Sequence, residues 1–430
     1  MTGIEQLIVY RNFEEGNLLH EMSWIMGHYD KDEYFEEAKA RFFSCMHELV
    51  DLAGTYGFEK NLWHDYLTLL LVNNENVFST ACEIKGITEG SLLDLAKHDF
   101  AIFRELFAYD FKAIEKAFAA DFFEEILNYR RAGAVSKVFN RRVRDRIGEL
   151  SKQLANAADL EEFTKYMVNF YCEFGVGKLG LHKAFRVVHD ENGVQIVPIR
   201  KIAHVQLDDL VGYEIPKKKL IDNTEAFVQG RKANNCLLFG DAGTGKSSSI
   251  KAILNQYYDQ GLRIIEIYKH QFQDLNDVIA QIKSRNYKFI IYMDDLSFEE
   301  FEIEYKYLKA VIEGGLEKKP DNILIYATSN RRHLIREKIG DNKEFDEDLH
   351  CNDTIQEKLS LVMRFGVSIY FSAPENKEFQ TIVKTLAARN GITMPEEQLL
   401  LEANKWELSH GGLSGRTAQQ FIDYLLGQVK

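Results

Sequence analysis

An eight-residue loop, Gly240–Ser247, constrains the fold of this chain more than any other segment. It reads Gly-Asp-Ala-Gly-Thr-Gly-Lys-Ser and matches the pattern G-x-x-x-x-G-K-[ST] at every fixed position. The apolar run Leu237–Phe239 precedes it, and a segment with helical pattern, Ser248–Tyr258, follows. Glycines let successive backbone N–H groups turn inward, and the next helix adds its positive N-terminal end. The segment therefore predicts a phosphate-binding loop between a strand and a helix.

The polar residues of this loop have predicted roles in holding a nucleoside triphosphate. Lys246 is placed to reach the β- and γ-phosphates, and the hydroxyl of Ser247 is placed to bind Mg²⁺. We therefore expect ATP and Mg²⁺ as cofactors, with Ser247 as a metal ligand. The loop residues expected to contact the nucleotide are Gly240, Asp241, Ala242, Gly243, Thr244, Gly245, Lys246, Ser247 and Ser248. A glycine-rich surface turn is the alternative, but it would not explain the strand pattern before the loop and the helix pattern after it.

Five short apolar runs, separated by helical segments, predict the strands of one domain. They are Cys236–Phe239, Arg263–Tyr268, Phe289–Met293, Ile323–Ala327 and Val367–Phe371. Continuous apolar runs are typical of parallel strands that are buried on both faces. Their alternation with helices predicts an α/β fold with a doubly wound, parallel five-stranded sheet.

Polar side chains follow two of these runs. Asp294 and Asp295 follow the third run, and Asn330 ends a Thr-Ser-Asn segment after the fourth. The carboxyl ends of parallel strands meet at the ligand-binding edge of such a sheet. We expect Asp294 to hold Mg²⁺ through water, Asp295 to orient or activate the attacking water, and Asn330 to position it. Taken alone, the two aspartates are more simply explained as a solvated strand end, and the Thr-Ser-Asn segment is equally compatible with a polar turn. The upstream loop favours the functional interpretation.

Proline content and apolar spacing divide the chain into regions. All five prolines lie after residue 197, and the first 180 residues carry apolar side chains at helical spacing. An Asn-Gly pair at 192–193 between two apolar segments predicts a hairpin. The predicted regions are a helical N-terminal domain (1–182), a hairpin or linker (183–206), an α/β nucleotide-binding domain (207–374) and a helical lid (375–430).

Net charge and cysteine content narrow the possible partners and the cellular compartment of the protein. The net charge of -13 argues against constitutive, sequence-independent binding of nucleic acid, which needs a surplus of Lys and Arg. The five cysteines are scattered and form no C-x-x-C pair, which favours a reducing compartment over a disulfide framework. No signal-peptide pattern begins the sequence, and its apolar runs are too short to cross a bilayer. We expect a soluble, cytoplasmic protein without a membrane partner.

The order of these motifs, followed by Arg-Phe-Gly and Ser-Gly-Arg segments, resembles the AAA+ ATPases. The resemblance implies an AAA+ α/β domain with a C-terminal helical lid. It gives Gly240–Ser247 the role of Walker A and the two aspartates, Asp294 and Asp295, that of Walker B. Asn330 would be sensor 1, a residue that acts beside the γ-phosphate.

Two arginines receive roles only from this resemblance. Arg364, in the Arg-Phe-Gly segment, would be the arginine finger, supplied to the next subunit of a homo-oligomer that forms with ATP. Arg416, in the lid, would be sensor 2, with a part in both catalysis and nucleotide binding. The segment Asp209–Tyr213 would touch the adenine, through Val211 and Gly212.

Residues 183–430 resemble one bacterial AAA+ family more specifically, domain-of-unknown-function family 815. The segments that carry this likeness are Asn223–Phe227, Asn234–Asn235, Asp294–Glu299 and Tyr326–Leu334. The family implies a fold and an ATPase site but no substrate. It leaves the role of the first 180 residues open.

Three functions are compatible with this pattern. The first is an oligomeric ATPase that hydrolyses Mg-ATP and remodels or loads a protein partner, bound through the helical N-terminal domain. The second is a switch or scaffold that binds ATP without turnover, since Asp295 stands where most P-loop ATPases of this type have Glu. The third is a loader acting on nucleic acid, suggested by the basic stretch Tyr129–Arg146, although a charged helix face is the simpler interpretation. A threading unfoldase is disfavoured, because Lys269–Asn276 lacks an aromatic–aliphatic–glycine motif.

Overall fold

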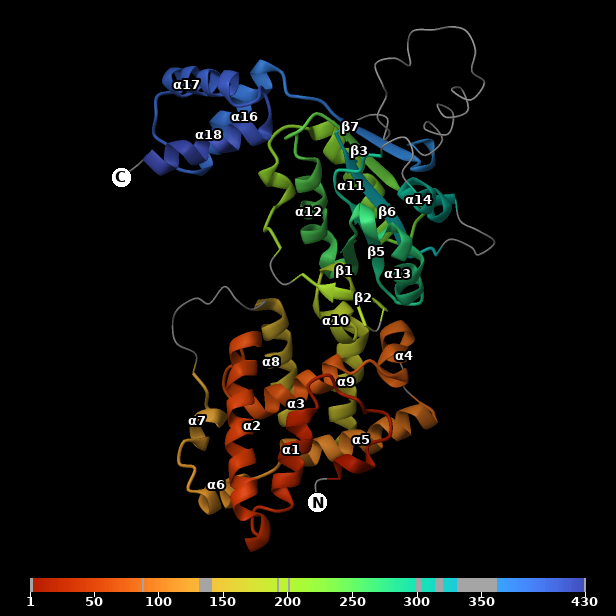
Figure 1. The fold of residues 1–430 in the computed structure, drawn as a ribbon, viewed down its shortest axis with the longest axis vertical. Coiled ribbons are helices and arrows are strands. Elements are labelled where there is room, and N and C mark those ends of the chain that lie inside the picture. The colour runs from red at the N-terminus through yellow and green to blue at the C-terminus, as the bar shows by residue number, and fades with distance from the viewer. Residues whose placement is uncertain are drawn as a thin grey trace. The chain divides into compact units, whose positions relative to one another are not determined.

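The computed structural model describes residues 3–86, 89–130, 141–191, 193–199, 202–298, 303–313, 320–330 and 362–428. The chain divides into two compact units, Met1–His182 and Lys183–Lys430. The first is all helical and the second contains the sheet (Figure 1). Within the described residues, no helix combines the length and apolar composition needed to span a bilayer.

The first unit is built around helix α3, which is buried on almost every side. All residues of Leu62–Val72 except His64 are buried, as expected for a helix that is apolar around its whole circumference. Phe42, Phe100 and Phe163 belong to the same core. The described helices of this unit are α1 (Asn17–Met26), α2 (Phe35–Tyr56), α3 (Leu62–Asn73), α4 (Val77–Lys85), α5 (Ser91–Phe107), α6 (Lys112–Phe118), α7 (Phe123–Leu127), α8 (Arg141–Ala155), α9 (Leu160–Phe174) and α10 (Gly177–Leu181).

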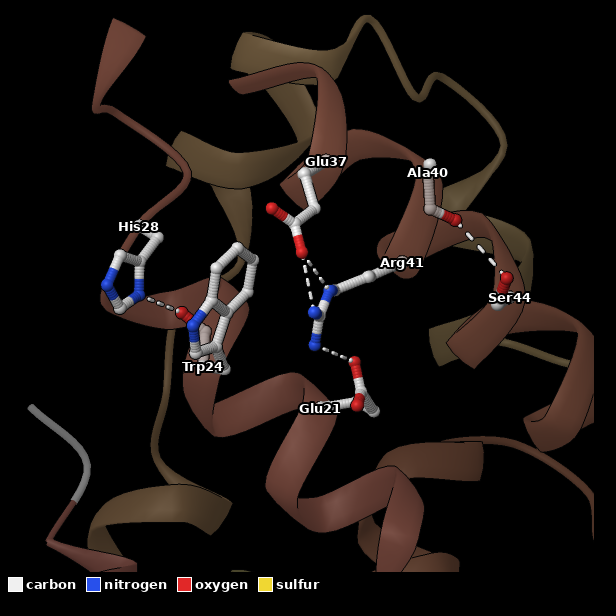
Figure 2. A network of polar contacts seen from close by, with 7 residues as sticks. All are labelled: Glu21, Trp24, His28, Glu37, Ala40, Arg41 and Ser44. Carbon is white, nitrogen blue, oxygen red and sulfur yellow. Dashed lines mark hydrogen bonds and ion pairs between the residues drawn. The ribbon is translucent and has the colours of Figure 1, made fainter. Parts of the chain in front are cut away.

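A surface network joins α1 to α2 (Figure 2). The Arg41 guanidinium donates to Glu21 of α1 at 2.9 Å and to Glu37, one turn back on α2, at 2.5 Å. It also lies 4.4 Å from the ring centre of Trp24, on which His28 stacks. Hydrogen bonds to two carboxylates raise the pKa of Arg41 and keep it charged. The network fixes the contact between the two helices. Its charged side chains are paired with one another, so we interpret its role as structural.

The second unit contains a seven-stranded sheet in the order β2-β1-β4-β5-β6-β3-β7. Its strands are β1 (Ala184–Asp190), β2 (Gly193–Pro198), β3 (Cys236–Gly240), β4 (Leu262–Glu266), β5 (Lys288–Met293), β6 (Ile323–Ser329) and β7 (Val367–Phe371). Strands β4, β5, β6, β3 and β7 are parallel, which confirms the predicted α/β class and its five strands. Their order places β3, and the loop that follows it, between β6 and β7.

The predicted hairpin is present, but it is not a separate linker, because both of its strands join the sheet. Strand β1 pairs in parallel with β4, and β2 pairs with β1 in the antiparallel sense, so the sheet has seven strands instead of five. Phe185, Val187 and Ile196 are buried in this position. The hairpin thereby covers the backbone edge that β4 would otherwise leave open.

Helices complete the second unit. Leu220 and Phe227 of α11 (Glu214–Val228) pack with Ile250 and Ile253 of α12 (Lys246–Tyr257) in the core on one side of the sheet. The other helices beside the sheet are α13 (Leu275–Ile282) and α14 (Ile303–Glu313). The last three helices, α16 (Asn376–Arg389), α17 (Glu396–Ser409) and α18 (Gly415–Gln428), share a separate small core and form the lid (Figure 1).

Candidate ATP-binding site

The loop between β3 and α12 (Lys246–Tyr257) is shaped by close approaches that only glycine tolerates. Gly240 has φ 131, and a Cβ there would lie 2.1 Å from the carbonyl oxygen of Phe371 in β7. Gly243 has φ 76, and a Cβ there would lie 2.8 Å from Oγ of Ser414, just before α18. The sheet constrains one glycine and the lid the other, so the loop is held from both sides.

Lys246 is almost fully buried at the start of α12. Its Nζ donates to the backbone carbonyls of Gly240 and Asp241, at 2.9 and 2.6 Å. A third bond, 3.0 Å long, reaches Oδ1 of Asn330. Burial lowers the pKa of Lys246, while Asp241 and Asp295 oppose that shift. All three acceptors are neutral, and no carboxylate of the described residues lies within ion-pair distance, so the charge is available to a phosphate.

Asp294, at the end of β5, is exposed but has one closely surrounded carboxylate oxygen. Its Oδ1 accepts from the hydroxyls of Ser247, Tyr292 and Thr328 at 2.8, 2.7 and 2.5 Å. The backbone N–H of Asp295 adds a fourth contact at 3.2 Å. None of the described residues donates to Oδ2. Partial burial acts to raise the pKa of Asp294, but the hydrogen bonds outweigh it and lower the pKa.

Asp295 is held in an unusual backbone conformation. Its φ of 49 lies in the left-handed region, which is uncommon for a residue other than glycine. Its N–H donates to Oγ1 of Thr328 at 3.0 Å, and its Oδ1 accepts from Nδ2 of Asn330 at 2.8 Å. Asn330 therefore links Asp295 to Lys246 through its two amide atoms.

These groups face one cavity of about 680 Å³, a size suited to a nucleotide. The sheet edge contributes Asp294, Asp295 and Asn330, and the lid contributes Arg416. The remaining loop residues that line it are Ala242, Gly243, Thr244, Gly245, Lys246, Ser247 and Ser248. Gly240 and Asp241 lie at the start of the loop, where their carbonyls hold Lys246.

The lid is joined directly to the phosphate loop. The N–H of Arg416 donates to the carbonyl of Gly243 at 3.1 Å, and Ser414 caps α18 through the N–H of Thr417 at 3.0 Å. The bond between Arg416 and Gly243 brings the exposed Arg416 to the cavity wall, although the two residues are more than 160 positions apart in the sequence.

Four predicted residues do not line the cavity: Gly240 and Asp241 at the start of the loop, Gly212, and Arg364. Arg364 is exposed and does not line the cavity of its own chain. Val211 lines it, whereas Gly212 does not. In the same segment Tyr213, whose pKa burial raises to about 12, lines the cavity instead.

Tyr292 and Thr328 are site residues that the sequence interpretation did not include. Both lie two positions, or one strand period, from a polar residue already predicted, Asp294 in one case and Asn330 in the other. Alternation along a strand puts such residues on the same side, so the strand pattern carried a signal for them.

A comparison with known protein families identifies the family of this chain. Residues 180–429 match the family described as "Protein of unknown function (DUF815)". The chain belongs to this family. Together with its family, the parallel sheet, phosphate loop and helical lid make this DUF815 protein an AAA+ nucleotide-binding protein.

More distant relatives share only part of the chain. The chromosomal replication initiator protein DnaA of Borreliella burgdorferi, in two strains, is 25% identical over 201 residues, 44% of this chain and 38% of the relative. The DUF815 chain thus spans well under half the length of these relatives. Among solved structures, a point mutant of RuvB from Thermotoga maritima has a TM-score of 0.36 at 18% identity, covering 52% of this chain and 65% of that one. The RuvB Holliday junction branch migration motor of the same organism has a TM-score of 0.32 at 16% identity, covering 51% and 72%.

Proposed function

We propose that this DUF815 protein is a cytoplasmic Mg²⁺-dependent ATPase that acts as a homo-oligomer on a protein partner. The observation that supports hydrolysis best is the chain of contacts from Lys246 through Asn330 to Asp295. The ammonium of Lys246 and the carboxylate of Asp295 are bonded to the two ends of one amide, which supports their proposed roles in binding the phosphate and orienting the attacking water. Mg²⁺, when bound, would neutralise charge on the phosphates, and Ser247 and Asp294 would hold it.

Metal binding is assigned to Ser247 and Asp294. No cluster of three or more His, Cys, Asp or Glu side chains able to hold a metal occurs among the described residues, so a dedicated metal cage is not supported there. Mg²⁺ commonly takes one or two protein ligands and completes its shell with phosphate oxygens and water. The Ser247 hydroxyl fits that requirement, and so does Oδ2 of Asp294, to which none of the described residues donates a hydrogen bond.

Phosphate release from Mg-ATP tests hydrolysis. Wild-type protein should turn over steadily, and Asp295→Asn should lose about 100-fold or more of the rate while still binding ATP, because the water loses its orienting carboxylate. Asp277→Asn, an exposed aspartate on α13, is the matched control and should keep the wild-type rate. Tight ATP binding without release in the wild type would instead support the second candidate, a nucleotide switch, which the short side chain of Asp295 favours.

The exposed position of Arg364 supports the oligomer. Because it lies away from its own cavity wall, we propose that it completes the site of a neighbouring subunit. Arg364→Ala and Asp295→Asn should each be inactive alone, whereas mixing them should restore part of the activity through sites that combine an intact Asp295 with an intact Arg364. A mixture that stays inactive, together with a protein that stays monomeric in ATP, would contradict this arrangement.

The helical unit is proposed to bind the protein partner. A nucleic-acid partner stays a weaker candidate, suggested by the names of the DnaA and RuvB proteins and by the basic stretch. Residues 131–140 of that stretch lie outside the described residues. Of its described arginines, Arg144 pairs with Asp145 at 2.6 Å and Arg146 lies 4.2 Å from the ring centre of Phe174. These contacts favour a structural role for α8. Salt-sensitive binding to DNA or RNA would reverse that preference.

A further inference from the structure

We propose that two buried hydroxyls, those of Tyr292 and Thr328, are positioning residues that reserve one oxygen of Asp294 for the metal ion. The inference rests on the proposed function, because it concerns the metal of the same ATP site. Nothing in the family description or in the likeness to other proteins assigns a role to either residue.

The first support is the uneven surroundings of the Asp294 carboxylate. Tyr292 and Thr328 both donate to Oδ1, at 2.7 and 2.5 Å, while none of the described residues donates to Oδ2. Donors on one oxygen fix the rotation of the carboxylate plane. The other oxygen is then the one left to meet a hydrated Mg²⁺, which demands near-ideal octahedral geometry.

The second support is that both donors are shielded from solvent. The side chains are nearly inaccessible, with Tyr292 4% and Thr328 2% exposed. Removal of either hydroxyl would take from Oδ1 a donor on the buried side of the carboxylate, where solvent has little access. Both donors sit on adjacent strands, β5 and β6, so the rigid sheet sets their distance from Asp294.

The third support separates the two hydroxyls. Oγ1 of Thr328 also accepts the N–H of Asp295 at 3.0 Å, the residue with φ 49. Thr328 therefore positions both carboxylates, whereas Tyr292 positions only Asp294. The two residues should consequently fail in different ways when they are changed.

The test uses Mn²⁺ as the metal probe with a non-hydrolysable ATP analogue, and phosphate release with Mg-ATP as the second readout. Tyr292→Phe should weaken Mn²⁺ binding to the protein–nucleotide complex by about 10-fold, within the range for lost outer-shell partners, and should regain its rate at saturating Mg²⁺. Thr328→Val should weaken Mn²⁺ to a similar degree but keep a low rate at saturating Mg²⁺, because Asp295 is also displaced. Thr328→Ser should restore both.

Tyr326→Phe is the matched control. Tyr326 is the neighbour of Tyr292 across β5 and β6 and is also buried. Its hydroxyl accepts a hydrogen bond from Nδ2 of Asn223 and shares another with the hydroxyl of Thr224, away from the site. It should leave Mn²⁺ binding unchanged. Wild-type Mn²⁺ affinity in both Tyr292→Phe and Thr328→Val, or an equal loss in Tyr326→Phe, would overturn the proposal. Absence of phosphate release in the wild type would refute hydrolysis, while the Mn²⁺ measurements would still decide the role of the hydroxyls.

Discussion

Two aspartates, one in each unit, show how surroundings separate a structural carboxyl group from one suited to bind a metal. Asp65 of α3 is 5% exposed, and burial raises its pKa to about 6 despite hydrogen bonds from Ser151 and the backbone of Glu59. Asp294 is exposed at a cavity, and its hydrogen bonds lower its pKa. The surroundings of Asp65 disfavour its charged form. Those of Asp294 favour its charged form, although none of the described residues pairs a cation with it.

The difference lies in the number and kind of donors. Neutral hydroxyls stabilise the charge of Asp294 without cancelling it, so the charge stays available for a cation from solution. The Arg41 network of α1 and α2 is the opposite case, since its guanidinium is matched by two carboxylates already in place (Figure 2). A carboxylate that is held by neutral donors at one oxygen is therefore a better indicator of a metal ligand than an ion pair is.

The largest expected effect is that of removing the charge at Asp294. Asp294→Asn keeps the size of the side chain but loses the anion, so Mn²⁺ binding to the nucleotide complex and phosphate release should each fall by about 100-fold. Metal titration followed by a phosphate assay measures both. Asp65→Asn, made in parallel, should change neither, and a comparable loss there would erase the distinction between the two aspartates.

Asp65→Asn should instead change stability in a pH-dependent way. The folded-state pKa near 6 lies above the usual value of 3.8, so the folded state binds more protons than the unfolded state between about pH 4 and 6. Stability contributed by this group is present below pH 4 and is lost as pH rises through 6. The variant should gain about 3 kcal/mol over wild type at pH 8 and little at pH 4. Unfolding followed by tryptophan fluorescence measures this, because Trp63 is buried in the core of the same unit. An equal gain at both pH values would show that ionisation of Asp65 is not the cause.

The smallest effect should come from Ser151, whose side chain lowers the pKa of Asp65. Ser151→Ala should destabilise the helical unit by about 1 kcal/mol at pH 8, where Asp65 is charged, and by less at pH 4. The same unfolding experiment detects it. A loss that does not depend on pH would assign Ser151 to packing alone.

The sequence predicted those parts of the fold and site that depend on neighbouring residues. The loop Gly240–Ser247 is contiguous, because a phosphate is held by successive backbone N–H groups, and the apolar run before Asp294 marks its strand. The position of Arg416 was available only from a family pattern, since its place at the cavity depends on a bond between the lid and Gly243.

Other parts depend on contacts that no local pattern encodes. The hairpin of β1 and β2 has the same alternation whether it stands alone or pairs with β4, so its place in the sheet was not predicted. The helical unit has a packed core, but we found no sequence motif in it that indicates a partner. Arg364 keeps its predicted role as a proposal, because a finger that serves a neighbour leaves its own cavity untouched.

The most direct test of the central claim is ATP binding and turnover by Lys246→Ala. Wild-type protein should bind a fluorescent ATP analogue with Mg²⁺ and release phosphate from ATP. Lys246→Ala should remain folded but lose at least about 100-fold in turnover and most of its affinity, because the buried ammonium at the start of α12 is gone. Unchanged binding and turnover in the variant would contradict the assignment of Gly240–Ser247 as the ATP site.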